Sequence, residues 1–223
     1  MSGALVVFAK RPAPGEVKTR LCPPLRPEQA AAFYAAMLDD VLEASHRACA
    51  ALDLEPVLAV HPPDAAGELP APKGWRQEPQ RGPDLGARME HAASHELDAG
   101  RTPVLLRGSD SPTLGQPTLA AALDALRCHD LVICPDRDGG YNLVGLRRPA
   151  PGLFTHPMST GTELDDTLAR AKRLGLTTHL LAPGFDIDTA EDLHLLAEAR
   201  KRGETKDCPR TIAWLDQNGL WPS

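Results

Sequence analysis

Short apolar runs recur along the chain and predict the strands of a buried sheet. Most of the runs are continuously apolar and are bounded by Gly, Pro or Asp, which is typical of strands covered on both faces. Such a sheet needs helices on its two sides. The predicted strands are residues 5–9, 56–60, 103–106, 131–134, 143–146 and 179–182.

Helical patterns lie between these runs. In residues 27–52, apolar side chains recur at spacings of three and four, as in Phe33, Met37 and Val41. Strands that alternate with helices predict an α/β fold with a mostly parallel sheet. The run at 139–146 follows the strand at 131–134 with no helical pattern between the two. This run is therefore expected to be antiparallel to its neighbour, and the sheet to be mixed. The further predicted helices are residues 84–98, 116–127, 162–174 and 189–201.

The chain predicts one α/β domain over residues 1–202, followed by a tail, 203–223, with a single helical turn near 212–215. Residues 62–83 are rich in Pro and Gly and are expected to form a loop with at most one short strand. A length of 223 residues and a hydrophobic fraction of 42% are enough for one core.

Charge and cysteine content narrow the class of protein. The net charge is −6 and the charges are interspersed, so a nucleic acid polymer is not an expected partner, although a small phosphorylated ligand needs only a local basic pocket. The five cysteines are odd in number and lack C-x-x-C spacing, which favours reduced thiols and a cytoplasmic protein. The apolar run at 4–9 is too short for a signal peptide, and no segment suggests a membrane span.

The first candidate site is the basic segment that follows the first predicted strand. Residues 10–20 contain four cationic side chains and a turn rich in Pro and Gly, whose backbone amides could face an anion. The segment is not a Walker A loop, because no Gly stands directly before its lysine. Phosphate binding is the favoured interpretation, and a solvated basic loop is the alternative. The cationic residues are Lys10, Arg11, Lys18 and Arg20.

The second candidate is the segment 108–114, which follows the strand at 103–106. Asp110 stands at this strand end among small residues, where a carboxylate can hold a hard cation such as Mg²⁺. The alternative is that Asp110 or Ser111 only caps the next helix.

The third candidate is the segment 135–143, in which Asp138 precedes the glycine pair Gly139 and Gly140. Glycine allows positive φ and lets a ligand approach the backbone closely. A tight β-turn is the alternative, because Asp-Gly is a strong turn signal. Both can hold if the turn presents these groups at the sheet edge.

The fourth candidate is the segment 185–193. Asp186 and Asp188 are two positions apart, so in an extended segment they point to the same side. Thr189 and Asp192 resemble a capping box, which leaves the first two carboxylates unexplained. Two adjacent carboxylates repel each other unless a cation or a proton lies between them.

A weaker candidate is the segment 81–89, which looks like the glycine-bearing start of a helix. Gly86 and Arg88 could contact a base or a phosphate there, or the segment could simply be a capped helix.

Four motifs in this order resemble those of DUF2064, a bacterial family of small GT-A-type transferases that is also called an arsenosugar-associated glycosyltransferase family. The motifs are F-A-K-x-P-x-P-G-x-x-K-T-R-L, G-S-D-S-P-T-L, D-G-G-Y-N-L-V-G-L and D-I-D-T-A-E-D-L. The layout is also similar to 2-phospholactate guanylyltransferases and, more distantly, to molybdenum-cofactor nucleotidyltransferases. The resemblance implies a single-domain GT-A (Rossmann-like) three-layer sandwich.

The resemblance also implies roles for individual residues. Asp110, Lys18 and Asp188 are expected to be catalytic, and Asp110, Asp188 and Asp186 to hold Mg²⁺ or Mn²⁺. GT-A enzymes often carry D-x-D where this chain has one Asp between two serines, so the second metal ligand is expected from Asp186 or Asp188. The acceptor is expected at Asp138, Gly139, Gly140 and Tyr141. The nucleotide is expected at Lys10, Pro12, Gly15, Lys18, Thr19, Arg20, Gly86, Arg88 and Ser109.

Two reactions would use the same nucleotide-binding, metal-binding and acceptor-binding residues. Glycosyl transfer from a nucleotide sugar to a small-molecule acceptor is the reaction favoured by the resemblance. Nucleotidyl transfer from an NTP to a small phosphorylated acid, with release of pyrophosphate, is the alternative. A nucleotide-binding protein without catalysis is a second alternative, which the single Asp in 109–111 supports.

Overall fold

Seven strands form one sheet in the computed structural model, which describes residues 2–158 and 160–222. They are β1 (Gly3–Lys10), β2 (Leu54–His61), β3 (Arg76–Pro79), β4 (Val104–Gly108), β5 (Leu131–Pro135), β6 (Tyr141–Leu146) and β7 (Thr178–Leu180). The sheet order is β3-β2-β1-β4-β6-β5-β7. Only β6 is antiparallel to its neighbours among the described strands, which confirms the predicted mixed sheet.

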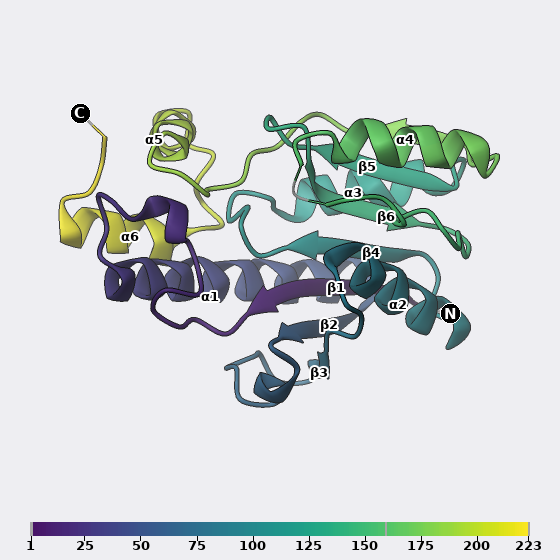
Figure 1. Ribbon diagram of the computed structural model, residues 1–223, viewed down its shortest axis with the longest axis horizontal. Coiled ribbons are helices and arrows are strands. Elements are labelled where there is room, and N and C mark those ends of the chain that lie inside the picture. Colours follow the sequence, from purple (N-terminus) through teal and green to yellow (C-terminus); the bar gives the residue numbers. More distant parts are fainter. Residues whose placement is uncertain (1, 159, 223) are drawn as a thin grey trace.

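Helices cover both faces of the sheet and make three layers (Figure 1). The helices α1 (Pro27–Leu52) and α3 (Gln116–Ala125) pack on one face, and α2 (Leu85–Asp98) and α4 (Glu163–Arg173) on the other. Successive residues of a strand point to opposite faces. Leu5 and Val7 of β1 therefore belong to the first core cluster, and Ala4 and Val6 belong to the second.

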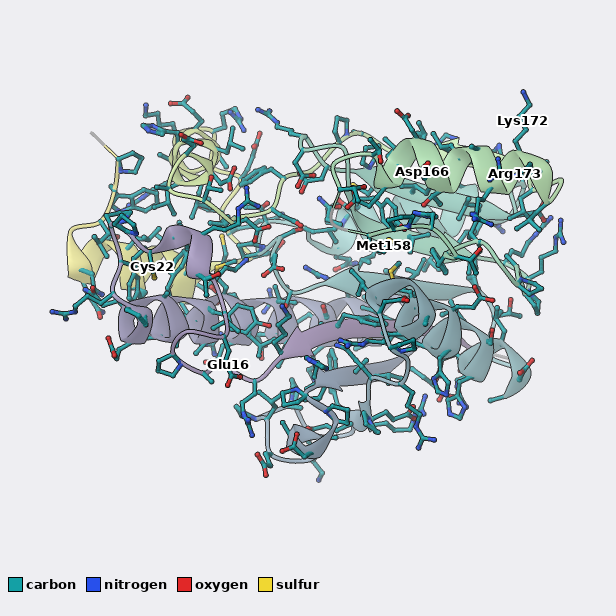
Figure 2. All side chains as sticks on the ribbon, in the orientation of Figure 1. Glu16, Cys22, Met158, Asp166, Lys172 and Arg173 are labelled. Atoms are coloured by element: carbon teal, nitrogen blue, oxygen red, sulfur yellow. The ribbon has the colours of Figure 1, made fainter. Side chains whose placement is uncertain are left out.

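The outer helix α4 is amphipathic, although Glu163 in its first turn is buried. The first turn of α4 is acidic and its last turn is basic, which complements the helix dipole. Lys172 projects from this last turn into solvent (Figure 2). Within residues 2–158 and 160–222, no helix combines the length and the apolar composition needed to cross a membrane.

The segment 203–223 differs from the predicted tail with one helical turn. It carries the ten-residue helix α6 (Pro209–Asn218), which lies beside α1 in Figure 1. Leu215 of α6 is fully buried in a third core cluster, together with Phe33 of α1 and Leu196 of α5 (Asp192–Lys201). The prediction of a single turn was wrong because a short helix is stabilised mainly by tertiary packing, here against residues of α1 and α5, which leaves little signal in the local sequence.

A buried carboxylate fixes the start of α6. Asp40 of α1 is 1% exposed, and its carboxylate oxygens accept hydrogen bonds from the backbone amides of Arg210 and Thr211 at 3.1 and 2.7 Å. These amides have no partner within the helix, so an anion there satisfies them and complements the dipole.

The substitution Leu215→Ala tests whether this segment is part of the folded core. We expect a loss of about 2–5 kcal/mol in the free energy of unfolding, because the change leaves a cavity at a fully buried position. Urea unfolding followed by circular dichroism measures it. Leu180→Ala is the matched control, since Leu180 is 44% exposed and should cost less than about 1 kcal/mol. Equal effects of the two changes would mean that α6 does not contribute to the core.

Candidate active site

The carboxyl ends of β1, β4 and β5 open into a cleft of about 880 Å³. This is the edge at which open α/β sheets bind ligands. The predicted site residues that line it are Lys10, Lys18, Arg20, Arg88, Ser109, Asp110, Asp138, Gly140, Tyr141, Asp186 and Asp188. Five other predicted residues are not among its lining residues in the described part of the chain: Pro12, Gly15, Thr19, Gly86 and Gly139.

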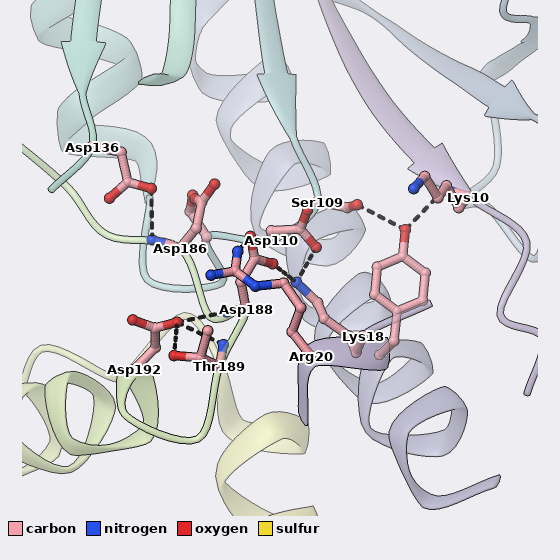
Figure 3. A network of polar contacts seen from close by, with 12 residues as sticks. Lys10, Lys18, Arg20, Ser109, Asp110, Asp136, Asp186, Asp188, Thr189 and Asp192 are labelled. Atoms are coloured by element: carbon pink, nitrogen blue, oxygen red, sulfur yellow. Dashed lines mark hydrogen bonds and ion pairs between the residues drawn. The ribbon is translucent and has the colours of Figure 1, made fainter. Parts of the chain in front are cut away.

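Lys18 forms ion pairs with Asp110 and Asp188 at the centre of the cleft (Figure 3). Its Nζ contacts Asp110 Oδ1 and lies 2.8 Å from Asp188 Oδ1. The Lys18 side chain is 4% exposed, whereas both carboxylate side chains are 37% exposed. The structure thus brings together the two carboxylates that the sequence predicted to meet, with the ammonium group between them.

This charge arrangement sets the protonation of the ion-paired groups. Burial alone would lower the pKa of Lys18, but the two carboxylates outweigh burial and raise this pKa above its ordinary value. Burial would likewise raise the pKa of Asp188, but Lys18 and the nearby Arg20 hold it below its ordinary value. The lysine is therefore an ammonium and Asp188 a carboxylate at neutral pH.

Backbone contacts hold these groups in place. Ile187 donates its backbone N–H to Asp110 O at 3.0 Å, which ties the segment after β4 to the segment before α5. Lys18 has φ 49°, a left-handed conformation that is rare for residues other than glycine. The surrounding structure must hold it there, and the two ion pairs of its side chain contribute to this.

Asp188 is free to face the cleft because another residue makes the local turn. Asp192 Oδ2 accepts hydrogen bonds from the backbone amides of Asp188 and Thr189 at 3.0 and 2.7 Å and from Thr189 Oγ1 at 2.9 Å. The predicted capping box of Thr189 and Asp192 is present only in part, because the Thr189 hydroxyl donates to the Asp192 carboxylate and α5 begins at Asp192 with Glu191 as its N-cap. The Asp188 carboxylate does not serve this turn.

Asp186 has different surroundings from Asp188, although it is only two positions away. Its carboxylate accepts a hydrogen bond from Ser111 Oγ, and its backbone N–H donates to Asp136 Oδ2 at 3.2 Å. Burial and the nearby carboxylates of Asp110 and Asp136 raise the pKa of Asp186 well above its ordinary value. In this structure Asp186 is the carboxyl group that most readily holds a proton.

Tyr34 of α1 contacts residues at the ends of β1 and β4 that line the cleft. It was not predicted as a site residue. Its hydroxyl accepts a hydrogen bond from the backbone N–H of Lys10 at 2.9 Å and shares one with Ser109 Oγ at 2.8 Å. The Lys18 Nζ lies 5.9 Å from the centre of the Tyr34 ring, within the range of a cation–π contact. Burial, with Asp110, raises the pKa of Tyr34 to about 12. The hydroxyl therefore links the ends of β1 and β4 in its neutral form.

Arg107 is a second buried support that the sequence did not reveal. Its guanidinium donates to the carbonyl oxygens of Ser111 and Leu114 at 2.9 and 3.1 Å and to Ser45 Oγ of α1 at 3.1 Å. Arg107 is 2% exposed, and burial lowers its pKa to about 10, so it remains charged. It holds the loop that carries Asp110 against α1.

The turn at 136–140 combines a structural and a cleft-lining role. Gly139 has φ 90°, its carbonyl accepts from Leu164 N at 3.0 Å, and a Cβ there would overlap the backbone oxygen of Gly161. The tight-turn alternative therefore holds for Gly139. Asp138 Oδ1 accepts from Gly140 N at 2.9 Å, and both residues line the cleft.

Gly86 and Arg88 have different roles, since Gly86 serves helix packing and Arg88 lines the cleft. A Cβ on Gly86 would overlap the backbone oxygen of Phe154, so this glycine allows the start of α2 to pack closely. Asp84 caps the helix by accepting from Ala87 N at 2.8 Å. Arg88 reaches the cleft, where its Nη1 lies 3.1 Å from His61 Nδ1.

The cleft is polarised along its length. It is lined by Lys10 at the end of β1, by Lys18 and Arg20 in the segment after β1, and by Arg88, which contacts His61 at the end of β2. Between the end of β5 and the start of β6 it is lined by Asp136 and Asp138, and Glu163 of α4 and Met158 also line the cleft. An extended anion is therefore best accommodated at the β1 end.

These features define a class of protein, the α/β transferases with the nucleotide-diphospho-sugar transferase fold. A solved structure from Desulfovibrio desulfuricans G20, described as a nucleotide-diphospho-sugar transferase, is similar to this chain with a TM-score of 0.86 and 29% sequence identity. The similarity covers 99% of this chain and 97% of that chain. It confirms the expected GT-A-like fold.

The family model described as "Uncharacterized protein conserved in bacteria (DUF2064)" matches residues 44–179, and the chain belongs to this family. The chain is also similar to two guanylyltransferases. It is 27% identical over 189 residues to the phosphoenolpyruvate guanylyltransferase of Chloroflexus aggregans, covering 82% of this chain and 92% of that protein. It is 34% identical over 182 residues to the 3-phospho-D-glycerate guanylyltransferase of Phenylobacterium zucineum, covering 78% and 81%.

The glycine pair offers a test of the two roles assigned to the turn. We expect Gly139→Ala to lower the free energy of unfolding by about 1–3 kcal/mol, because of its positive φ and the overlap with Gly161. Gly140→Ala should change it by less than about 1 kcal/mol, since Gly140 lacks a positive φ and meets only the Asp138 side chain. Chemical unfolding measures both. Equal destabilisation by both changes would show that Gly140 is also only a turn residue.

Proposed function

We propose that this chain is a metal-dependent nucleotidyltransferase, which transfers a nucleotidyl group from an NTP to a small phosphorylated acid and releases pyrophosphate. The observation that carries the proposal is the meeting of Asp110, Asp188 and Lys18 beside a cationic cleft. The two relatives named above are guanylyltransferases, so GTP is the nucleotide that we propose. We place the transferase site in residues 1–202, and residues 203–223 complete the third core cluster.

The cationic end of the cleft is suited to the triphosphate. We assign Lys10, Lys18 and Arg20 to its phosphates, with Arg88 and Ser109 as further contacts. Charge developing on the departing pyrophosphate is stabilised by cations that are already in place. The residues Pro12, Gly15, Thr19 and Gly86, which do not line the cleft, would act on the nucleotide only by shaping the segments that do.

The carboxylates fit a divalent cation. Asp110 and Asp188 are partly exposed, both contact one ammonium group, and offer the oxygen ligands that Mg²⁺ and Mn²⁺ prefer. Asp186 is the reserve ligand, although Ser111 engages its carboxylate and its pKa is raised by burial and by the carboxylates of Asp110 and Asp136. When bound, the cation neutralises negative charge on the reacting phosphates.

The protein groups then have distinct tasks in the transfer. An oxygen of the acceptor phosphate attacks the α-phosphorus of the NTP, and the bond from that phosphorus to the pyrophosphate oxygen breaks. The chain holds both anions in line, with the acceptor near Asp138, Gly140 and Tyr141 and Gly139 shaping that turn. No proton transfer is required, because an ionised phosphate oxygen is already a nucleophile.

Glycosyl transfer from a nucleotide sugar has less support than nucleotidyl transfer. The same cleft could stabilise a departing diphosphate, but the two relatives named above are both guanylyltransferases. The alternative of a nucleotide-binding protein without catalysis also has less support. The single Asp in 109–111 is complemented by Asp188 from another segment.

Product analysis tests the proposed reaction directly. With Mg²⁺ and GTP, we expect pyrophosphate release that depends on phosphoenolpyruvate, 3-phospho-D-glycerate or 2-phospho-L-lactate. Nucleotide sugars should give no nucleoside diphosphate. Release of nucleoside diphosphate from a nucleotide sugar, without pyrophosphate from any NTP, would favour the glycosyl reaction instead.

Asp110→Asn tests the metal centre within this reaction. The amide is nearly the same size but uncharged, so we expect turnover to fall by at least about 100-fold while the thermal unfolding midpoint changes little. Asp124→Asn is the matched control, because Asp124 is 79% exposed on α3 and lies outside the cleft. Normal turnover of Asp110→Asn would rule out its assigned role.

A further inference from the structure

Lys18 occupies the position that a shared metal ion would need. Its Nζ contacts one oxygen of Asp110 and one of Asp188, which are the two atoms that would face a common cation. Lys18 is nearly inaccessible, whereas both carboxylates remain open to the cleft. The site can therefore be reached by a metal ion, but its two carboxylates are already paired.

We propose that Lys18 and a divalent cation compete for the Asp110–Asp188 pair, and that nucleotide phosphates resolve the competition by drawing Lys18 away. The inference rests on the proposed function, because it takes this pair as the metal ligands. It adds a binding order, in which the free protein holds metal weakly and the nucleotide prepares the metal site.

Simple electrostatics supports the competition. An ammonium group and a divalent cation cannot occupy the same position between these two oxygens, and at contact distance they repel each other strongly in a partly buried site. Lys18 cannot simply withdraw into the protein, because a buried ammonium without an anionic partner is costly. A phosphate group in the cleft is the replacement partner that lets Lys18 leave the carboxylates.

The neighbouring cationic residues Arg20 and Lys10 do not compete with a metal ion for the Asp110–Asp188 pair. Arg20 approaches only the far oxygen of Asp188, at 4.0 Å, and its side chain is 68% exposed. It can turn into solvent when a metal ion arrives, at little cost. Lys10 is exposed at the end of β1, and its backbone rather than its ammonium group is fixed, by Tyr34.

The competition makes metal and nucleotide binding cooperative. If phosphate binding releases the carboxylates, it strengthens metal binding, and by thermodynamic reciprocity the metal strengthens nucleotide binding by the same factor. Removing the Lys18 ammonium should therefore have opposite effects on two measurements. It should weaken turnover, because a phosphate contact is lost, and strengthen metal binding to the free protein.

Titration of the nucleotide-free, full-length protein with Mn²⁺, followed by electron paramagnetic resonance, tests this inference without relying on activity. We expect Lys18→Met to bind Mn²⁺ at least about tenfold more tightly than the unaltered protein at pH 7.5, within the usual range of coupling between sites. Lys18→Gln should behave in the same way, and provides the measurement if the methionine variant does not fold. Arg20→Met is the matched control and should change the affinity by less than about threefold.

The double variant Lys18→Met with Asp110→Asn identifies the site of the added affinity, and it should lose the gain. Unchanged or weaker Mn²⁺ binding by both Lys18 variants, with folded protein confirmed by circular dichroism, would overturn the competition and leave the proposed reaction intact. Tighter Mn²⁺ binding by the Lys18 variants, together with no GTP-dependent pyrophosphate release by the unaltered protein, would instead support the competition and refute the proposed reaction.

Discussion

The ion pairs between the Lys18 ammonium and the carboxylates of Asp110 and Asp188 are the interaction on which the site depends. The three residues come from three segments, after β1, after β4 and before α5, and each segment needs the others to satisfy its charge. A buried ammonium is stable only with anionic partners, so the sheet edge must bring these segments together. The backbone hydrogen bond from Ile187 to Asp110 adds a second link that does not depend on charge.

A buried polar layer below this centre keeps the same edge rigid. Tyr34 joins the ends of β1 and β4 through Lys10 and Ser109, and Arg107 ties the Asp110 loop to α1. Buried polar groups of this kind are costly unless their hydrogen bonds are made, and here carbonyl and hydroxyl partners satisfy them. The segments that carry Lys18, Asp110 and Asp188 are loops, yet groups that cannot move without losing these bonds support them. The site is therefore held in position before any ligand arrives.

The sequence predicted those features that have a local signal. Buried strands, long amphipathic helices and polar residues at strand ends each leave a pattern, so the sheet and the segments with Lys18, Asp110 and Asp188 were found. Tyr34 and Arg107 were missed because one lies within an ordinary helical pattern and the other at the end of an apolar run. Only tertiary packing turns them toward the cleft. The difference between Asp186 and Asp188 is likewise invisible in D-I-D-T, because it comes from Ser111 and Lys18 far away in the chain.

The polarity of the cleft links this arrangement to the choice between the two reactions. Besides the ion-paired Lys18, three cations from β1, the segment after it and α2 line the cleft, whereas the turn between β5 and β6 presents Asp136 and Asp138. An NTP carries more phosphate charge than a nucleotide sugar, so it makes fuller use of the cationic end. An acidic acceptor entering from the other end meets carboxylates, and its charge must be countered from the centre. A divalent cation between Asp110 and Asp188 would meet that need, and Lys18 would then be free to hold the triphosphate. In the proposed reaction, transfer to an anion would therefore depend on the exchange of one cation for another at the centre.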